Sequence, residues 1–254
     1  MDNRQYTKRN FRDLSIYTNE EGYSLKEGLF FRSGKLYKLS KKELELFNDL
    51  QIKTILDFRT PGEQDNKPDT VLPGASCHTL PLVESEMFGI THEGKKPARY
   101  SRPPNMPSLY RKLVTADIAV NAIKRALQMI FDPNREGPIL WHCTEGKDRA
   151  GLVTVMFLYA LGYSLDTIYE DYQKTNASSE PKGKRYRALI RVFMFNNKLA
   201  QGVYQAMLAS KEYLDAAIDE INKVYGGLSQ FLHNQLGITQ EMIDIFKAKY
   251  MIKK

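Results

Sequence analysis

A short polar loop between two apolar segments holds the residues of this chain that are best suited to covalent chemistry. The sequence runs GPILWHC up to Cys143, continues with TEGKDR and then enters AGLVTVMFLYAL. Cys143 is one of only two cysteines, and Arg149 follows it six positions later. A thiolate is a strong nucleophile, and a guanidinium can hold two oxygens of a phosphate at once. The types and spacing of these two residues therefore indicate attack on a phosphate group.

The segments on either side of the loop predict how these residues are positioned. Residues 137–143 read as a strand and residues 151–164 as a buried helix that stops near Gly162. Ligands of open α/β sheets bind at the carboxyl ends of the strands, where Cys143 is expected. The amides of residues 144–149 can curl around an anion, and the positive end of the helix points at the same place. Such a field favours a thiolate at neutral pH, and Gly146 allows the tight turn that the loop needs.

These parts suit a reaction in which the thiolate attacks phosphorus, a cysteinyl-phosphate forms, and water hydrolyses it. A general acid must protonate the leaving oxygen. Two aspartates are candidates: Asp148 is inside the loop, and Asp57 ends another predicted strand that could lie beside the Cys143 strand. Lys147 adds positive charge for substrates that bear more than one phosphate.

Strands alternate with helices in the first part of the chain, which predicts an α/β fold with a parallel sheet. We expect strands at residues 29–32, 52–57, 77–82 and 137–143, and helices at residues 41–50, 108–131 and 151–164. Ser40 and Glu43 form a capping box at the start of the first helix. Residues 60–69 and 89–107 are expected to be loops because of their Pro, Gly and Asn content. After Leu165 only helices are expected.

The predicted fold is therefore a single domain over residues 1–254 with a central, mostly parallel sheet flanked by helices. Residues 1–163 are expected to form the α/β core, with a phosphate loop at residues 142–149. Residues 164–254 are expected to form an all-helical C-terminal extension that packs on this core.

The composition is that of an ordinary globular protein, with 254 residues of which 42% are hydrophobic and 26% charged. No apolar run has the length of a membrane span, and the polar N-terminal residues lack a signal core. We therefore expect a cytoplasmic protein, or a secreted one if a leader was removed. Two cysteines make no disulfide framework, and neither they nor the four histidines show metal-ligand spacing. No metal or other cofactor is expected.

The net charge of +7 suits an anionic partner, such as a nucleic acid, a phosphorylated substrate or a membrane surface. A nucleic-acid partner is not expected, because no recognition motif is present and the basic residues are spread along the chain. Residues 182–191, KGKRYRALIR, could bind further phosphates or a membrane surface, although such a run is more often a solvated helix face. A transient contact with a membrane surface is therefore left open, and no obligate partner is expected.

Several segments resemble the bacterial cysteine-dependent tyrosine phosphatases, the family that includes mycobacterial protein-tyrosine phosphatase B. In chain order they are NFRDL at 10–14, LFFRSGKL at 29–36, ILDFRTPGE at 55–63, HCTEGKDRAG at 142–151, DYQKTN at 171–176 and YGGLSQFLHNQLGIT at 225–239. The resemblance covers most of the chain. It implies a cysteine-phosphatase fold without a cofactor, and activity on phosphotyrosine, phosphoserine or phosphothreonine, and phosphoinositides.

The resemblance also implies roles for individual residues. Cys143 would be the nucleophile, Arg149 the phosphate clamp, Asp148 the general acid and Asp57 a supporting residue, while Lys147 occupies the position linked to activity on phosphoinositides. The residues expected to bind phosphate or substrate are Thr144, Glu145, Gly146, Lys147, Asp148 and Arg149. His142 is expected to hold the loop by hydrogen bonds rather than to act as a base.

Two positions depart from the family pattern. Ala150 stands where a threonine or serine is usual, whose hydroxyl would stabilise the cysteine sulfur as a leaving group. Glu145 stands where a small residue is usual, and its carboxylate would either disfavour very acidic substrates or pair with a nearby base. A phosphate-binding module with little or no turnover therefore remains the alternative function. Cys77 is expected to pack in the core, with a redox bridge to Cys143 as the alternative.

Overall fold

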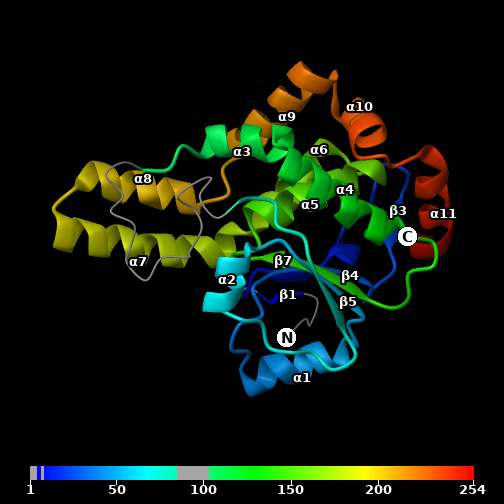
Figure 1. Ribbon diagram of the computed structural model, residues 1–254, viewed down its shortest axis with the longest axis horizontal. Coiled ribbons are helices and arrows are strands. Elements are labelled where there is room, and N and C mark those ends of the chain that lie inside the picture. The colour runs from blue at the N-terminus through cyan, green and yellow to red at the C-terminus, as the bar shows by residue number, and fades with distance from the viewer. Residues whose placement is uncertain (1–4, 7–8, 85–102) are drawn as a thin grey trace.

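The computed structural model describes residues 5–6, 9–84 and 103–254 and centres on a six-stranded sheet (Figure 1). In spatial order the strands are β1 (Gln5–Tyr6), β2 (Phe11–Asp13), β4 (Phe30–Gly34), β7 (Ile139–Cys143), β5 (Thr54–Asp57) and β6 (Ser76–Thr79). The four strands from β4 to β6 are parallel, and β1 and β2 continue the sheet in antiparallel pairs. The expected mostly parallel α/β sheet is confirmed.

Helices cover both faces of the sheet. They are α1 (Lys41–Asp49), α2 (Pro61–Asn66), α3 (Met106–Thr115), α4 (Asp117–Phe131), α5 (Asp148–Ala160), α6 (Leu165–Lys174), α7 (Asn176–Met194), α8 (Asn197–Met207), α9 (Lys211–Tyr225), α10 (Leu228–Gln230) and α11 (Gln240–Tyr250). A 3-10 turn, η2 (Leu14–Ile16), and a π-helical turn, η3 (Phe231–Gln235), are further helical elements.

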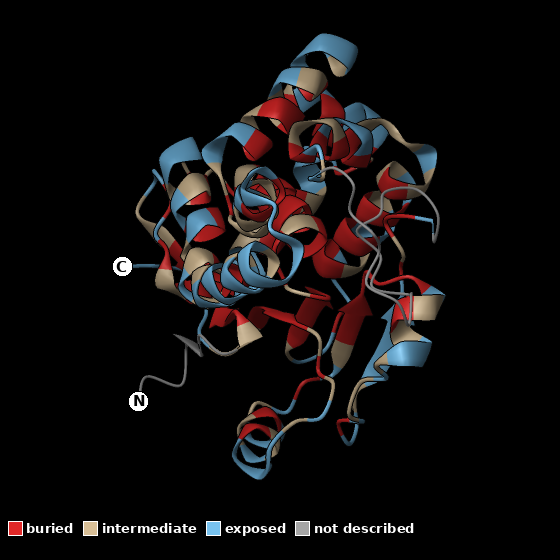
Figure 2. Cartoon of the chain, turned by 90° about the vertical axis from the view of Figure 1, so that its left-hand side faces the viewer, coloured by how far each residue is buried: buried red, intermediate tan, exposed pale blue. Residues whose placement is uncertain are grey.

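The central strands separate two apolar clusters, because successive side chains of a strand point to opposite faces. Phe31 and Leu140 pack with Phe47 of α1 on one face. Phe30 and Trp141 belong to the larger cluster on the other face, which includes most of the buried residues of α5. Every residue of β4 and β7 is buried, and Figure 2 shows buried residues concentrated in the sheet and in the helices at the centre of the molecule. The strand that ends at Cys143 is thus held rigidly on both sides.

Several expected elements differ from the structure. Residues 60–69 are not wholly a loop, because α2 forms there with Pro61 at its first turn and a capping box between Thr60 and Glu63. The helix expected at residues 108–131 is interrupted at Ala116, whose backbone is extended. The expected loop at residues 89–107 lies outside the described residues up to residue 102, and α3 already begins at Met106. Cys77 is exposed on β6 and unbridged, so the expected core packing of this residue is wrong.

The C-terminal part is helical apart from a short final strand. β8 (Met251–Lys253) pairs antiparallel with β3 (Tyr23–Leu25), so the last residues return to the N-terminal part of the chain. None of the helices in the described part of the chain combines the length and the apolar composition of a membrane span.

α7 and α8 form a hairpin that projects from the rest of the molecule, at the left of Figure 1. Gly183 permits close packing of the two helices, since a Cβ there would lie 3.0 Å from the ring of Tyr204. The base of the hairpin is fixed by Asn176, whose side chain accepts a hydrogen bond from the Ala209 amide at 2.7 Å and donates to the Ala209 carbonyl at 3.1 Å. We call this element the α7–α8 hairpin.

Candidate active site

Cys143 ends β7 and is buried, and residues 144–147 connect it to the first turn of α5. Gly146 has a positive φ of 68°. A Cβ at this position would lie 2.4 Å from the Ser33 carbonyl oxygen of the neighbouring strand, so only glycine fits. The structure therefore places the predicted loop at the carboxyl end of a central parallel strand, between that strand and a helix N-terminus.

Arg149 is held in place by Glu63, which lies in segment 55–63 and has no assigned role at the level of sequence. Its two terminal nitrogens donate to the two carboxylate oxygens of Glu63 at 2.6 and 2.9 Å. The Thr144 hydroxyl donates to the same carboxylate at 2.5 Å. Burial alone would raise the pKa of Glu63, but the hydrogen bonds and charge of Arg149, together with hydrogen bonds from Thr144 and Thr60, lower the pKa to about 2. An ionised Glu63 thus sets the direction of the guanidinium beside the loop.

The loop carbonyls are held from behind by two residues of the N-terminal part. Arg32 donates to the Gly146 carbonyl at 2.6 Å, and the Asn10 side-chain amide donates to the same oxygen at 2.9 Å. Asn10 also donates to the Glu145 carbonyl at 3.2 Å. The C=O and N–H of one trans peptide point in opposite directions. Fixing these carbonyls therefore directs the amides of Gly146 and Lys147 to the other side of the loop, where they can bind an anion.

Asp171 connects the arginines that support the loop. Its carboxylate accepts hydrogen bonds from Arg12 Nε at 2.6 Å and from the Tyr17 hydroxyl at 3.1 Å, and it forms an ion pair with Arg32. Burial would raise the pKa of Asp171, but the two arginines lower it to about 2. Segments 10–14, 29–36 and 171–176, which had no role at the level of sequence, thus meet in one buried network behind the phosphate loop.

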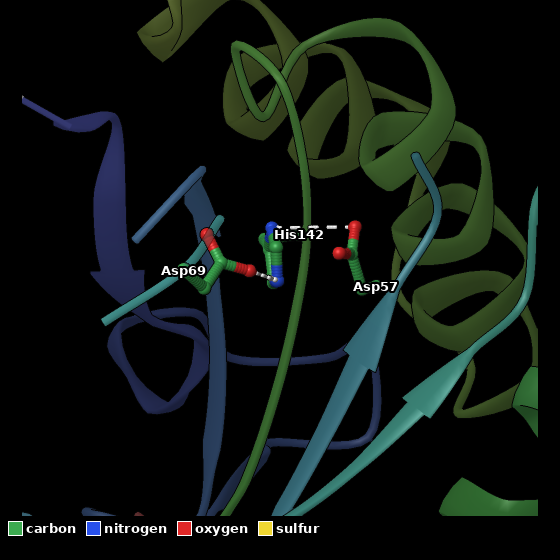
Figure 3. A group of neighbouring side chains, drawn as sticks. All are labelled: Asp57, Asp69 and His142. Atoms are coloured by element: carbon green, nitrogen blue, oxygen red, sulfur yellow. Dashed lines mark ion pairs between the residues drawn. The ribbon is translucent and has the colours of Figure 1, made fainter. Parts of the chain in front are cut away.

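His142 lies between the carboxylates of Asp69 and Asp57 (Figure 3). Its Nε2 is 3.1 Å from Asp69 Oδ2, and its Nδ1 is 3.8 Å from Asp57 Oδ1. Burial would lower the pKa of His142, but the two aspartates raise it above the ordinary value. The Nδ1 atom is also 3.4 Å from the Cys143 carbonyl oxygen. His142 therefore sits within a charged cluster that also contains Asp69, which no sequence pattern marks as a site residue.

Asp57, Asp69 and His142 are close enough together to hold a metal ion. Arg59, however, donates to Asp57 Oδ2 at 2.7 Å and to Asp69 Oδ2 at 2.6 Å. The Arg59 guanidinium thus already binds both carboxylates. The arrangement is best described as a buried ion-pair network, and its donors do not favour a cation.

Asp148 begins α5 and is the more accessible of the two aspartates proposed as general acid. Its side chain is 17% exposed, and its Oδ1 accepts a hydrogen bond from the Tyr110 hydroxyl at 2.6 Å. The Tyr110 hydroxyl in turn lies 2.6 Å from that of Tyr172. Asp57 is buried and bound by Arg59. The structure thus places both aspartates near the loop, but in different environments.

Lys147 and Glu145 connect the loop to the α7–α8 hairpin. Lys147 Nζ donates to the Ala206 carbonyl of α8 at 2.6 Å and lies 3.3 Å from Asp148 Oδ1. The Glu145 carboxylate pairs with Lys182 of α7 at 2.6 Å and with Lys35 at 3.4 Å. Of the two expectations for Glu145, the structure therefore agrees with pairing to a nearby base.

Comparisons with known proteins cover nearly the whole chain. A family model described as the tyrosine phosphatase family matches residues 6–252. A candidate tyrosine-protein phosphatase of Cupriavidus necator is 26% identical over 232 residues, which span 90% of this chain and 82% of that protein. The triple specificity protein phosphatase PtpB of Mycobacterium tuberculosis is 27% identical over 267 residues, which span 92% of this chain and 94% of that protein. The core catalytic domain of the PP-IP phosphatase SIW14 of S. cerevisiae aligns with a TM-score of 0.39 at 16% identity, over 85% of this chain and 94% of that chain.

Proposed function

This chain belongs to the tyrosine phosphatase family, and from that membership we propose that it hydrolyses phosphate monoesters through a cysteinyl-phosphate at Cys143. One observation carries the proposal. Arg149 follows Cys143 through a loop whose carbonyls are held from behind, and an ionised Glu63 directs its guanidinium. A nucleophile, amide donors and a guanidinium then lie together at one loop, as transfer of a phosphoryl group requires.

In the first step, the Cys143 thiolate attacks phosphorus, the S–P bond forms, and the bond from phosphorus to the ester oxygen breaks. Arg149 and the loop amides hold the oxygens of the phosphoryl group as charge develops on them. The leaving oxygen takes a proton from Asp148. In the second step, water gives a proton to the Asp148 carboxylate and attacks phosphorus. Inorganic phosphate leaves, and the thiolate of Cys143 returns.

Asp148 is the better general acid of the two candidates. A general acid must reach the leaving oxygen, and Asp57 is buried and held by the guanidinium of Arg59 through contacts of 2.7 to 3.1 Å. Asp148 is partly exposed, accepts a hydrogen bond from Tyr110, and starts the helix that follows the loop. Asp57 is proposed instead to position His142 and Arg59 beside the end of β7.

Replacement of Asp148 by asparagine is expected to lower kcat/KM on a phosphotyrosine peptide by about 10²- to 10⁴-fold. The loss of kcat/KM on para-nitrophenyl phosphate should be much smaller, because nitrophenolate leaves without a proton. Asp57→Asn serves as the matched control, and any loss it causes should be similar on both substrates. The measurement is kcat/KM of both variants on both substrates, because kcat/KM reports the step in which the leaving group departs and not the later hydrolysis of the phosphoenzyme. If only the Asp57→Asn variant lost more activity on the peptide than on para-nitrophenyl phosphate, Asp57 and not Asp148 would be the general acid.

For the substrate, we propose phosphotyrosine in proteins first, with phosphoserine, phosphothreonine and phosphoinositides as further substrates. The M. tuberculosis relative is named for triple specificity. Lys147, the position linked to phosphoinositides, donates to a backbone carbonyl of α8 and is buried. Its ammonium group is thus engaged within the protein, which favours substrates with a single phosphate.

The proposal is tested by phosphate release from a phosphotyrosine peptide, a phosphoserine peptide and phosphoinositide micelles. We expect steady-state turnover that is fastest on phosphotyrosine. The alternative, a phosphate-binding module, rests on Ala150, which is buried and brings no hydroxyl to the cysteine sulfur. It predicts at most one equivalent of product in a rapid burst, followed by no turnover, and that outcome would overturn the proposed hydrolysis.

A further inference from the structure

The tip of the α7–α8 hairpin exposes an uninterrupted run of apolar side chains. Residues 191–198 are all exposed, and their sequence is RVFMFNNK. Val192 is 63% exposed, Phe193 75%, Met194 51% and Phe195 90%. Exposed apolar residues are common singly, but a contiguous group of this size marks a surface that meets another apolar phase.

The apolar surface continues from the tip along one side of α7. Tyr186, Leu189 and Phe193 are exposed and follow a spacing of three and four positions, which places them on one helix face. Phe195 has a left-handed backbone, with φ of 49°, and reverses the chain between the two helices. The hairpin projects from the body of the molecule (Figure 1), so this surface is presented at its far end. With 19 residues, α7 is about 28 Å long.

The part of the sequence that forms the tip carries charge of a single sign. Residues 181–210 contain no aspartate or glutamate, and they contain the six basic residues Lys182, Lys184, Arg185, Arg187, Arg191 and Lys198. Lys182 and Lys184 form ion pairs with acids outside this stretch, whereas Arg191 and Lys198 flank the apolar tip directly. An apolar surface bordered by cations is complementary to lipid headgroups that carry negative charge above an acyl layer.

We propose that the tip of the α7–α8 hairpin docks on a membrane surface that contains anionic lipids. Phe193 and Phe195 enter the boundary between headgroups and acyl chains, and Arg191 and Lys198 lie among the negatively charged headgroups. The hairpin rests on the surface without spanning the bilayer. The hairpin also contacts Glu145 and Lys147 of the phosphate loop. Docking of its tip therefore holds this loop at a fixed distance from the membrane surface. The proposal does not depend on which phosphate ester is hydrolysed.

The test is co-sedimentation of the full chain with vesicles of phosphatidylcholine alone and of an equimolar mixture with phosphatidylserine. Wild type is expected to bind the mixed vesicles and not the neutral ones. Phe193→Ser combined with Phe195→Ser should weaken binding at least about tenfold. Arg191→Gln combined with Lys198→Gln should weaken it by about tenfold or more, with a smaller salt dependence than wild type.

The matched control is Val224→Ser combined with Ile245→Ser, which removes two exposed apolar side chains elsewhere. It should bind vesicles as wild type does. Hydrolysis of soluble para-nitrophenyl phosphate by the tip variants should remain unchanged, which shows that they are folded. Wild type that binds neither kind of vesicle would overturn the proposal, and so would a tip variant that binds as tightly as wild type. A dimer that dissociates in the tip variant, without vesicle binding, would assign the surface to a second copy of this chain instead.

Discussion

Replacing Cys143 with serine is expected to lower phosphate release from every substrate by at least about 10⁴-fold, as loss of a covalent nucleophile does in other enzymes. A serine hydroxyl stays protonated at neutral pH and attacks phosphorus poorly. The variant should still bind phosphorylated ligands, because Arg149, Glu63 and the loop amides are unchanged. The measurement combines steady-state phosphate release with equilibrium binding of a phosphotyrosine peptide.

Cys77→Ser is the matched control for this experiment. Cys77 is the other cysteine of the chain and is exposed on the edge strand β6. The pKa of the thiol is raised to about 11, mainly by partial burial and to a smaller extent by the nearby carboxylates of Asp57 and Asp69. The thiol therefore remains protonated at neutral pH. Its replacement should leave turnover unchanged. Full activity in Cys143→Ser, or an equal loss in both variants, would contradict a cysteinyl-phosphate at Cys143.

Asp171→Asn is expected to have the largest effect on stability, lowering the free energy of unfolding by about 3–5 kcal/mol. Arg12 and Arg32 are buried, and the Asp171 carboxylate faces both of them. An asparagine keeps the size of the side chain but leaves two buried guanidinium groups without their anion. The measurement is denaturant unfolding at neutral pH. Activity of the folded fraction should also fall, because Arg32 holds the Gly146 carbonyl of the phosphate loop.

The matched control is Glu170→Gln, which removes the neighbouring acid from the same helix. Glu170 pairs with Lys174 on the exposed face of α6, and such a surface pair contributes less than about 1 kcal/mol. Equal unfolding free energies for the two variants would show that the buried network is not needed for the fold.

The pH dependence of unfolding gives a second check on Asp171. The folded-state pKa of about 2 lies below the ordinary value of 3.8. This carboxylate therefore stabilises the fold above about pH 4, and its contribution is lost as the pH falls toward 2. The variant should lack this part of the acid dependence.

The sequence alone determined the local parts of the candidate site. The strand before Cys143, the loop and the helix after it are contiguous, and their apolar patterns and turn residues depend on neighbours within a few positions. The mostly parallel sheet also followed from local patterns, because alternating strands and helices leave few other arrangements. The same local logic failed where two signals competed. Residues 60–69 have the composition of a loop, but the capping box of Thr60 and Glu63 starts a short helix.

Only the tertiary structure decided which groups support the loop and how they are charged. Arg149 meets Glu63 across 86 positions of sequence, and Arg32 meets Asp171 across 139. Neither pairing has a local pattern, because Glu63 and Asp171 lie on helices whose packing beside the sheet depends on the whole fold. These charged side chains need oppositely charged partners because they are buried, and their burial is likewise a property of the folded chain. The sequence therefore determined where the nucleophile and its loop lie, while packing decided that Glu63 holds Arg149, that Lys147 faces α8, and that the apolar tip of the hairpin remains exposed.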